Sequence, residues 1–267
     1  MDRSDLERRV AALERQVKDL RAAVMPAYWQ AMDAVEAQRG PDRRVACPVC
    51  DRAARRGDLE ALVDTCVFGG GRLERFACAG CGCVFGPAKV LEVSEALLGA
   101  DYALLYEDYS EADSTENELR AFRSLRPVAG GAYLDWGCGR WSRTVAELRA
   151  QGFDAWGFEP SAPPADGSFV VGDRAAVTGR FDGLFSNNVV EHLLRPVEEF
   201  RFFHRILKPG ARMAHASPCY RYTCAHTRFH TLFLTGDSPA VLADRSGFRV
   251  VGREEDGEFI NVVFERA

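Results

Sequence analysis

Four cysteines stand in two pairs whose spacing suits a tetrahedral metal ion. Cys47 and Cys50 form one CxxC pair, Cys78 and Cys81 form the other, and 27 residues separate the pairs. Thiolates at positions i and i+3 wrap one side of a Zn²⁺ ion, so two pairs complete its coordination. Because four cysteines leave no open position, we expect a structural zinc rather than a catalytic one. Cys83 competes with Cys81 as the fourth ligand, and register with the first pair favours Cys81.

The insert between the pairs predicts a small, strand-rich module. Two CxxC turns around such an insert resemble a zinc ribbon, which we place at residues 41–89. Cys66 lies inside the insert and is expected to be a buried apolar residue. Acidic and basic residues are mixed along the insert, so it offers no basic stripe for nucleic acid.

A second group of residues suits a ligand that carries a nucleoside. An apolar strand ending at Trp136 runs into a turn with Gly137 and Gly139, which allow positive φ and close approach of a ligand to the backbone. A helix follows and points its free N–H groups at the turn. Twenty residues after Gly139 a second strand ends at Glu159, which is placed to accept hydrogen bonds from a ribose. Trp141 stands near the third glycine of a dinucleotide fingerprint, which disfavours NAD and FAD.

Together with motifs further along, this turn resembles the class I S-adenosylmethionine (SAM)-dependent methyltransferases. Their first motif is hydrophobic-Asp-x-Gly-x-Gly-x-Gly, and Asp135 joins the two glycines in matching it. The segment 181–193, FDGLFSNNVVEHL, is similar to the family's fourth strand and following turn, and 203–210, FHRILKPG, continues the match. The resemblance covers about residues 130–215 and is specific in combination.

The resemblance implies the fold and the cofactor. We expect an α/β, Rossmann-like methyltransferase sheet of seven strands with helices on both faces over residues 128–267. The family's cofactor, SAM, is expected at the carboxyl ends of the first strands, and the acid after the third strand meets the adenine amino group. The residues expected to bind SAM are Asp135, Gly137, Cys138, Gly139, Glu159, Pro160, Asp173 and Asn187.

Methylation of a hydroxyl needs a base that takes the hydroxyl proton, and histidines are the candidates here. His192 follows the fourth strand at the edge of the sheet where ligands bind, and an ordinary histidine pKa of about 6.5 suits the task. Because the Glu191-His192 pair recurs in the family with many acceptors, support of the SAM-binding loop is the alternative role. Glu191 is expected to be a structural hydrogen-bonding residue.

The segment 215–230 is unusually polar for one connection after the fifth strand. It holds three histidines, two arginines and two tyrosines, which suit hydroxyls, phosphate or carboxylate. The rival bases are His215, His226 and His230, and the expected acceptor-binding residues are Tyr220, Tyr222 and Arg228. A solvated loop is the alternative. No carboxylate pattern accompanies these histidines in sequence, so a second metal site is unsupported at this stage.

Residues 90–127 are expected to be a helical lead-in that covers the cofactor site. In the resembled family an aromatic N-terminal helix often folds over the cofactor, and Tyr106 and Tyr109 would then contact SAM or the acceptor. Packing of these rings in the core is the alternative.

The N-terminal residues 2–25 carry a heptad seam within an oligomerising helix at residues 1–40. The spacing of the apolar residues alternates four and three without a break, which favours a parallel two-stranded coiled coil and hence a homo-oligomer. The seam residues are Leu6, Val10, Leu13, Val17, Leu20 and Val24. Arg9 and Glu14 would pair across such a dimer. A single amphipathic helix packed on its own domain is the alternative.

Composition bounds the remaining classes. The 267 residues carry a net charge of −5, so no overall basic field attracts nucleic acid. No apolar run reaches the roughly 20 residues of a membrane span, and the charged N-terminus is unlike a signal peptide. Nine cysteines, an odd number with two CxxC pairs, fit reduced thiols and a cytoplasmic protein.

These features predict a SAM-dependent O-methyltransferase. The order of coil, ribbon and core resembles bacterial enzymes that modify sugars in glycans or natural products, which makes a sugar or related polar hydroxyl the expected acceptor. Methylation of RNA is one alternative, against which the acidic charge balance counts. A non-catalytic scaffold with the same fold is another, since Trp141 departs from the first motif.

Overall fold

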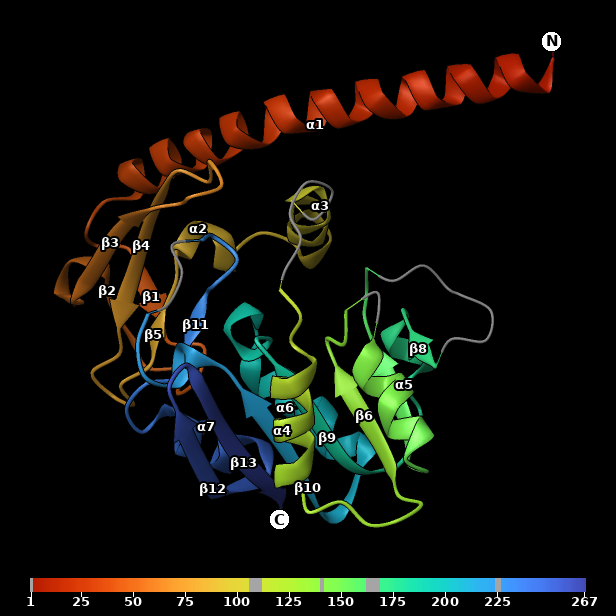
Figure 1. Ribbon diagram of the computed structural model, residues 1–267. Helices are drawn as coiled ribbons and strands as arrows, with labels where there is room; N and C mark the ends of the chain where they lie inside the picture. Colours follow the sequence, from red (N-terminus) through yellow and green to blue (C-terminus); the bar gives the residue numbers. More distant parts are fainter. Residues whose placement is uncertain (1, 106–111, 140–141, 162–168, 224–226) are drawn as a thin grey trace.

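The computed structural model shows an α/β body that carries a small second sheet and a projecting helix (Figure 1). It describes residues 2–105, 112–139, 142–161, 169–223 and 227–267. Four residues named above lie outside the described residues: Tyr106, Tyr109, Trp141 and His226.

The chain begins with one long helix, α1 (Arg3–Arg39), and Asp2 caps it by accepting a hydrogen bond from the Ser4 amide. The first buried residue of α1 is Trp29, and the part before it extends away from the body (Figure 1). All six seam residues are exposed, so the seam does not pack on the rest of this chain. No helix in the described part of the chain is both long enough and apolar enough to cross a membrane.

The segment after α1 forms two small antiparallel sheets. The first pairs β1 (Arg44–Ala46) with β2 (Ala53–Arg55). The strands of the second are β3 (Ala61–Thr65), β4 (Arg72–Ala77), β5 (Val84–Phe85) and β11 (Leu232–Phe233). Their order is β11-β5-β4-β3, so a strand from the C-terminal region completes the sheet of the cysteine module.

Three helices lead from this module to the large sheet: α2 (Ala88–Leu91), α3 (Glu95–Leu105) and α4 (Thr115–Ser124). The first two hold the base of α1. Lys89 of α2 is buried and forms an ion pair with Asp33 of α1 at 2.5 Å. Trp29 Nε1 of α1 donates to the Asp101 carboxylate of α3 at 3.0 Å.

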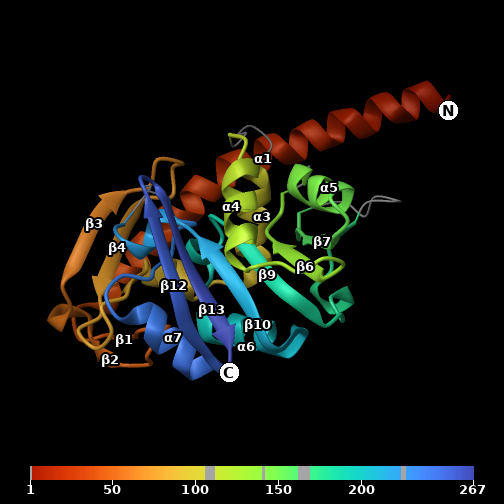
Figure 2. The ribbon, with the colours of Figure 1, turned by 60° about the horizontal axis from the view of Figure 1, so that its bottom comes forward.

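The large sheet has seven strands, as the sequence predicts. They are β6 (Ala132–Trp136), β7 (Asp154–Phe158), β8 (Val170–Val171), β9 (Phe181–Asn187), β10 (Leu207–Ala216), β12 (Phe248–Asp256) and β13 (Phe259–Arg266). Their order is β12-β13-β10-β9-β6-β7-β8, and Figure 2 shows the strands from β12 to β7 side by side. The five strands from β6 to β10 are parallel, and β13 runs antiparallel to both of its neighbours.

Helices cover both faces of this sheet, which confirms the expected Rossmann-like architecture. The helices are α4 together with α5 (Arg143–Ala150) on one face, and α6 (Pro196–Ile206) and α7 (Ser238–Ser246) on the other. Successive residues of β6 alternate between the faces, as pleating requires. Tyr133 packs with Phe122 of α4, whereas Leu134 belongs to the core on the side of α6.

The cysteine module and the large sheet share one hydrophobic core. Cys47 and Phe76 of the module belong to the same buried cluster as Trp136 of β6 and Phe203 of α6. Phe233 of β11 lies in that cluster as well. The expected boundary at residue 89 therefore separates two modules in sequence that pack as one body.

Candidate active site

The turn after β6 has the close packing and the open space that a cofactor site needs. Gly137 has φ +79°, and a Cβ atom there would lie 2.5 Å from Val189 Cγ2. Its amide donates to the Phe158 carbonyl at 2.8 Å, which ties the turn to β7. Gly139 has φ +68°, and among the residues that the structure describes no atom lies within 4 Å of the place of a Cβ there. The turn is thus packed against Val189 at Gly137, whereas the described residues leave Gly139 uncovered.

The Glu159 carboxylate lies directly at this turn. Its Oε2 accepts a hydrogen bond from the Gly139 amide at 3.2 Å. Its Oε1 accepts from the amide and the hydroxyl of Ser161, at 3.0 and 2.7 Å. The carboxylate is held in place by the backbone, which is the arrangement expected of a residue that receives a ribose diol.

Asp135 adds a second, buried carboxylate behind the turn. Its Oδ2 has no hydrogen-bond partner among the residues that the structure describes. Burial raises the Asp135 pKa well above the ordinary range, and the charges of Glu118 and Glu159 add to the effect. Three carboxylates near one turn favour a cationic ligand, because a nearby positive charge would compensate their burial.

These observations fit SAM, the cofactor that the fold implies. SAM carries a sulfonium and an amino group, so it supplies a positive charge that would compensate the buried Asp135 carboxylate. No described residue covers Gly139 where the ligand would lie, and Glu159 provides the acceptor for a ribose.

The other expected cofactor residues lie at the same edge of the sheet with different exposure. Cys138 is buried, and its thiol donates to the Gly139 carbonyl at 3.4 Å, so its amide and carbonyl rather than its thiol belong to the turn. Pro160 is exposed beside Glu159. Asp173 is exposed, and its Oδ1 accepts from the Ala175 amide at 2.8 Å. Asn187 is the half-buried last residue of β9.

His192 lies in a short 3-10 turn, η3 (Val190–His192), directly after β9. Its Nδ1 is 3.1 Å from the Phe229 carbonyl oxygen. A carbonyl can only accept, so Nδ1 carries the proton and Nε2 keeps its lone pair. Burial, followed by the neighbouring His230, lowers the His192 pKa to about 3. The imidazole is therefore neutral at physiological pH.

The structure brings His230 next to His192. The two rings meet edge to face with centroids 4.9 Å apart, and the ring of Tyr102 in α3 also packs against His192, with centroids 5.5 Å apart. The loop that carries His230 is fixed from two directions. The Thr231 amide donates to the Glu191 carbonyl at 2.8 Å, and Arg75 of β4 donates to the Thr227 carbonyl at 2.9 Å. Two of the four candidate bases thus share one place.

His215 is a core residue rather than an acceptor base, which corrects the expectation from sequence. It is 1% exposed near the carboxyl end of β10, and its Nδ1 lies 2.7 Å from Ser186 Oγ. The rings of Phe200 and Phe203 pack against it. Burial lowers its pKa to about 3, and no acceptor can reach the ring.

Arg228 is also occupied within the protein. Its guanidinium makes a two-pronged ion pair with Asp101, at 2.6 and 2.7 Å, and both side chains are buried. It further donates to Cys66 Sγ at 3.5 Å. This arrangement ties the loop before His230 to α3 and leaves no free guanidinium for an anionic acceptor. Cys66 itself is buried, as expected from sequence.

The two tyrosines of the same segment make their contacts elsewhere in the protein. Tyr220 is 2% exposed in the 3-10 turn η4 (Pro218–Tyr220), so its ring packs inside the protein. Tyr222 is partly exposed and its hydroxyl donates to Glu258, in the turn between β12 and β13. Sequence reasoning missed Tyr102 and Glu118, which have no motif around them and are identified only by what they contact.

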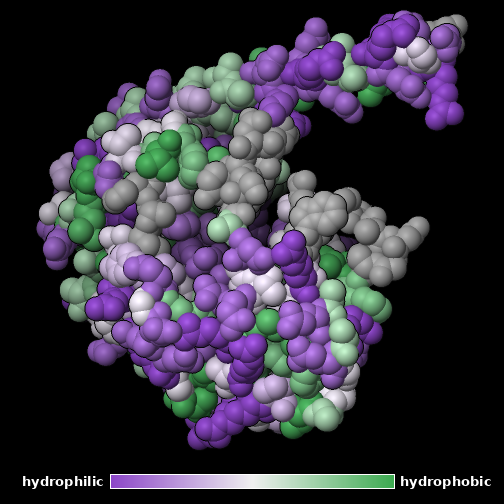
Figure 3. Space-filling view, in the orientation of Figure 1, coloured by the Kyte–Doolittle hydropathy of each residue, from purple (hydrophilic) through white to green (hydrophobic). Residues whose placement is uncertain are grey.

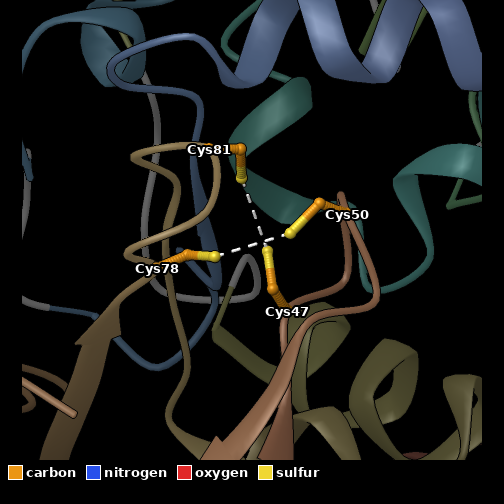
Figure 4. A group of neighbouring side chains, drawn as sticks. All are labelled: Cys47, Cys50, Cys78 and Cys81. Carbon is orange, nitrogen blue, oxygen red and sulfur yellow. Dashed lines mark hydrogen bonds between the residues drawn. The ribbon is translucent and has the colours of Figure 1, made fainter.

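The four cysteines converge as their spacing predicts (Figure 4). Sγ of Cys47 is 3.7 Å from Sγ of Cys81, and Sγ of Cys50 is 3.5 Å from Sγ of Cys78. Zinc–sulfur bonds of about 2.3 Å in a tetrahedron place sulfurs about 3.8 Å apart, so the spacing fits zinc. The Cys83 thiol contacts the Val84 carbonyl at 3.6 Å and the Cys47 thiol as well, but it is not among the four side chains whose ligand atoms converge.

Comparison with known proteins agrees with this geometry. The family described as "Methyltransferase domain" matches residues 110–252, more than half of the chain. The chain belongs to this methyltransferase family. With the fold and the glycine turn, that membership identifies a SAM-dependent methyltransferase. No curated protein gave a significant match to the methyltransferase in sequence.

One solved structure shows the same fold at low sequence identity, and two others are similar over a smaller share of this chain. The 1,6-didemethyltoxoflavin-N1-methyltransferase of Burkholderia thailandensis is 17% identical, with a TM-score of 0.54 over 71% of this methyltransferase and 97% of that chain. A SAM-dependent methyltransferase of Mesorhizobium loti is 18% identical, with a TM-score of 0.44 over 56% and 98%. The mitomycin 7-O-methyltransferase MmcR is 18% identical, with a TM-score of 0.46 over 65% and 59%.

Proposed function

We propose that this methyltransferase methylates a hydroxyl group on a polar small molecule, with sugars and glycan units as the preferred class. The observation that carries the proposal is geometric: the rings of His192 and His230 meet with centroids 4.9 Å apart, and the segment that carries His192 adjoins the glycine turn. Val189, which contacts Gly137, precedes η3 directly, so the pair and the cofactor turn are neighbours.

The residues can perform the transfer by positioning and proton uptake. When bound, SAM supplies an electrophilic methyl carbon and a thioether leaving group. His192 Nε2 accepts the hydroxyl proton as the new oxygen–carbon bond forms and the carbon–sulfur bond breaks. The Phe229 carbonyl holds Nδ1–H and steadies the imidazolium that results. His230 and Tyr102 fix the plane of the ring.

The test is a methyl-transfer screen with labelled SAM against hydroxyl-bearing sugars and sugar nucleotides. His192→Gln is expected to lower turnover by about 10²–10⁴-fold and to leave SAM affinity unchanged, since general-base catalysis contributes about that much. His204→Gln is the matched control, because His204 lies on α6 and contacts Arg266 instead. Full activity of His192→Gln would contradict the proposed base.

The same screen separates the alternative functions. Transfer to ribosomal RNA, weakened steeply by salt, would favour RNA methylation, because phosphate contacts make such binding salt-dependent. SAM binding with no turnover on any acceptor would favour a scaffold. The proposal includes a structural zinc ion in the four-cysteine site and a cytoplasmic location, because such a site needs reduced thiols.

We further propose a second copy of this chain as the partner of α1. The seam residues are 44–64% exposed along the projecting part of the helix. Hydrophobic residues interrupt its otherwise hydrophilic surface in Figure 3. A parallel pair of such helices would bury both seams. In light scattering, Leu20→Glu should convert the oligomer to a monomer, whereas Ala22→Glu, off the seam, should not. A wild-type monomer at high concentration would refute the pairing.

A further inference from the structure

Besides the four cysteines, one other group in the described part of the chain brings three metal-ligating side chains together. One ligand atom from each of Glu191, His192 and His230 lies within 4.8 Å of the other two. Glu191 is buried, and the two histidines are half-buried, so the group lies at the boundary between core and open space. Sequence alone conceals this group, because 37 residues separate His192 from His230.

The chemistry of the group matches a divalent transition-metal ion. Two imidazole nitrogens and one carboxylate oxygen are the protein ligands of several catalytic zinc and iron sites. Ligands at about 2.0–2.2 Å from such an ion lie roughly 3–4 Å apart, so small side-chain rotations close the present spacing. Three protein ligands leave at least one coordination position for another molecule. The four-cysteine group differs in this respect, since it has no open position.

The ligands are also oriented as metal ligands commonly are. The Phe229 carbonyl holds Nδ1–H of His192, and a partner of this kind fixes the ring and directs Nε2 toward an ion. The two segments that carry the ligands are joined by the hydrogen bond from the Thr231 amide to the Glu191 carbonyl. Arg75 holds the His230 loop from the other side. The site is therefore organised by contacts that no ion is needed to form.

We propose that Glu191, His192 and His230 bind a divalent transition-metal ion, and that the acceptor's hydroxyl oxygen takes its open position. Coordination lowers the pKa of a bound hydroxyl, so its proton leaves to water. The oxygen then forms the bond to the methyl carbon, the carbon–sulfur bond breaks, and the metal keeps its oxidation state. His192 then serves as a ligand rather than as the proton acceptor. Activation of the acceptor hydroxyl by the ion rests on the proposed function, whereas binding of the ion does not.

The test begins without acceptor or SAM. Full-length protein with one equivalent of zinc in the cysteine site is titrated with Co²⁺ and followed by visible absorption. One further equivalent should bind with the weak d–d bands of nitrogen and oxygen ligands and without thiolate charge-transfer bands. His230→Gln and His192→Gln should each weaken this binding by at least about tenfold. His204→Gln should bind as the wild type does, and circular dichroism shows that each variant is folded.

The outcomes separate the two proposals. Absence of Co²⁺ binding to the zinc-loaded protein, or equal binding by all three variants, would overturn the metal site and leave the histidine-base mechanism standing. Methyl transfer that persists at full rate after this second ion alone is removed would overturn the metal's role in activation. Co²⁺ binding that depends on His192 and His230 supports the site even where no hydroxyl acceptor is methylated, an outcome that counts against the proposed function instead.

Discussion

Gly139 and Gly130 share a backbone conformation and differ in their location. Both have φ near +69°, at +68° and +69°, and in the described part of the chain neither has an atom within 4 Å of the place of a Cβ. Gly130 lies before β6, away from the turn, whereas Gly139 lies where the cofactor is expected. The pair therefore separates the cost of backbone strain from the cost of filling the site.

We expect Gly139→Ala and Gly130→Ala to lose similar stability, about 1–2 kcal/mol each, because an L-residue is strained at positive φ. Only Gly139→Ala should lose SAM affinity, by at least about tenfold, since its methyl group occupies the open side of the turn. Thermal unfolding and calorimetric titration with SAM measure the two effects. Equal SAM affinity in both variants would place the cofactor elsewhere.

The raised pKa of Asp135 makes SAM binding depend on pH. The protein without ligand keeps a proton on Asp135 above the ordinary carboxyl range, and a cationic ligand favours the ionised form. Binding therefore releases a proton, and SAM affinity should rise with pH through the Asp135 titration and then level off. Calorimetry in buffers of different ionisation enthalpy measures the release, and Asp135→Asn should abolish it. Proton uptake on binding would contradict this assignment.

The sequence predicted the glycine turn, Glu159 and the cysteine ligands because each belongs to a short motif with fixed spacing. It misplaced Arg228 and His215 for a common reason. Their side chains contact partners that are distant in sequence. Arg228 pairs with Asp101, and His215 packs on Phe200 and forms a hydrogen bond with Ser186. A polar residue at the end of β10 or in the loop that follows looks the same in sequence whether it faces a ligand or a buried partner.

At the scale of elements, the Asp101–Arg228 pair joins α3 to the loop before His230, and Trp29 extends the link to α1. We expect Asp101→Ala to lower stability by about 3–5 kcal/mol, because it leaves a buried guanidinium unpaired. The double variant Asp101→Leu, Arg228→Met should recover most of the loss. Urea unfolding measures both.

An exposed ion pair supplies the control for that prediction. Glu116 and Arg123 pair at 3.0 Å on the surface of α4 with more than half of each side chain exposed. Glu116→Ala should therefore cost less than about 1 kcal/mol. A cost for Asp101→Ala as small as that for Glu116→Ala would show that the buried pair adds nothing to the link.

The seven strands of the large sheet were predictable because the strand–turn–helix units occur in the family's order. Strand β11 of the four-stranded sheet was not predictable. The two residues of β11 are too few for a periodic pattern, and they pair with Val84 and Phe85 almost 150 residues earlier. Nor does the heptad seam in α1 reveal that the helix continues to Arg39 and is anchored by Trp29.

For the whole molecule, the shared core predicts that zinc supports the catalytic sheet as well as the ribbon. Removal of zinc by a chelator should lower the melting temperature in a single transition, because Cys47, Cys78 and Cys81 are in the same cluster as Trp136. A loss of about 3 kcal/mol corresponds to roughly 6–12 °C for a chain of this size. Calorimetry before and after chelation, with zinc restored as the control, measures the shift. Two separate transitions would show that the ribbon melts alone.

The place of β11 also bears on how the protein is made. A ribosome releases the cysteine pairs and β3 to β5 long before it releases residues 232–233, which complete their sheet. At about 5–20 residues per second, the edge of β5 waits roughly 10–30 s for its partner. During synthesis the nascent ribbon thus exposes an unpaired strand edge. The N-terminal module reaches its final form only when the C-terminal region emerges.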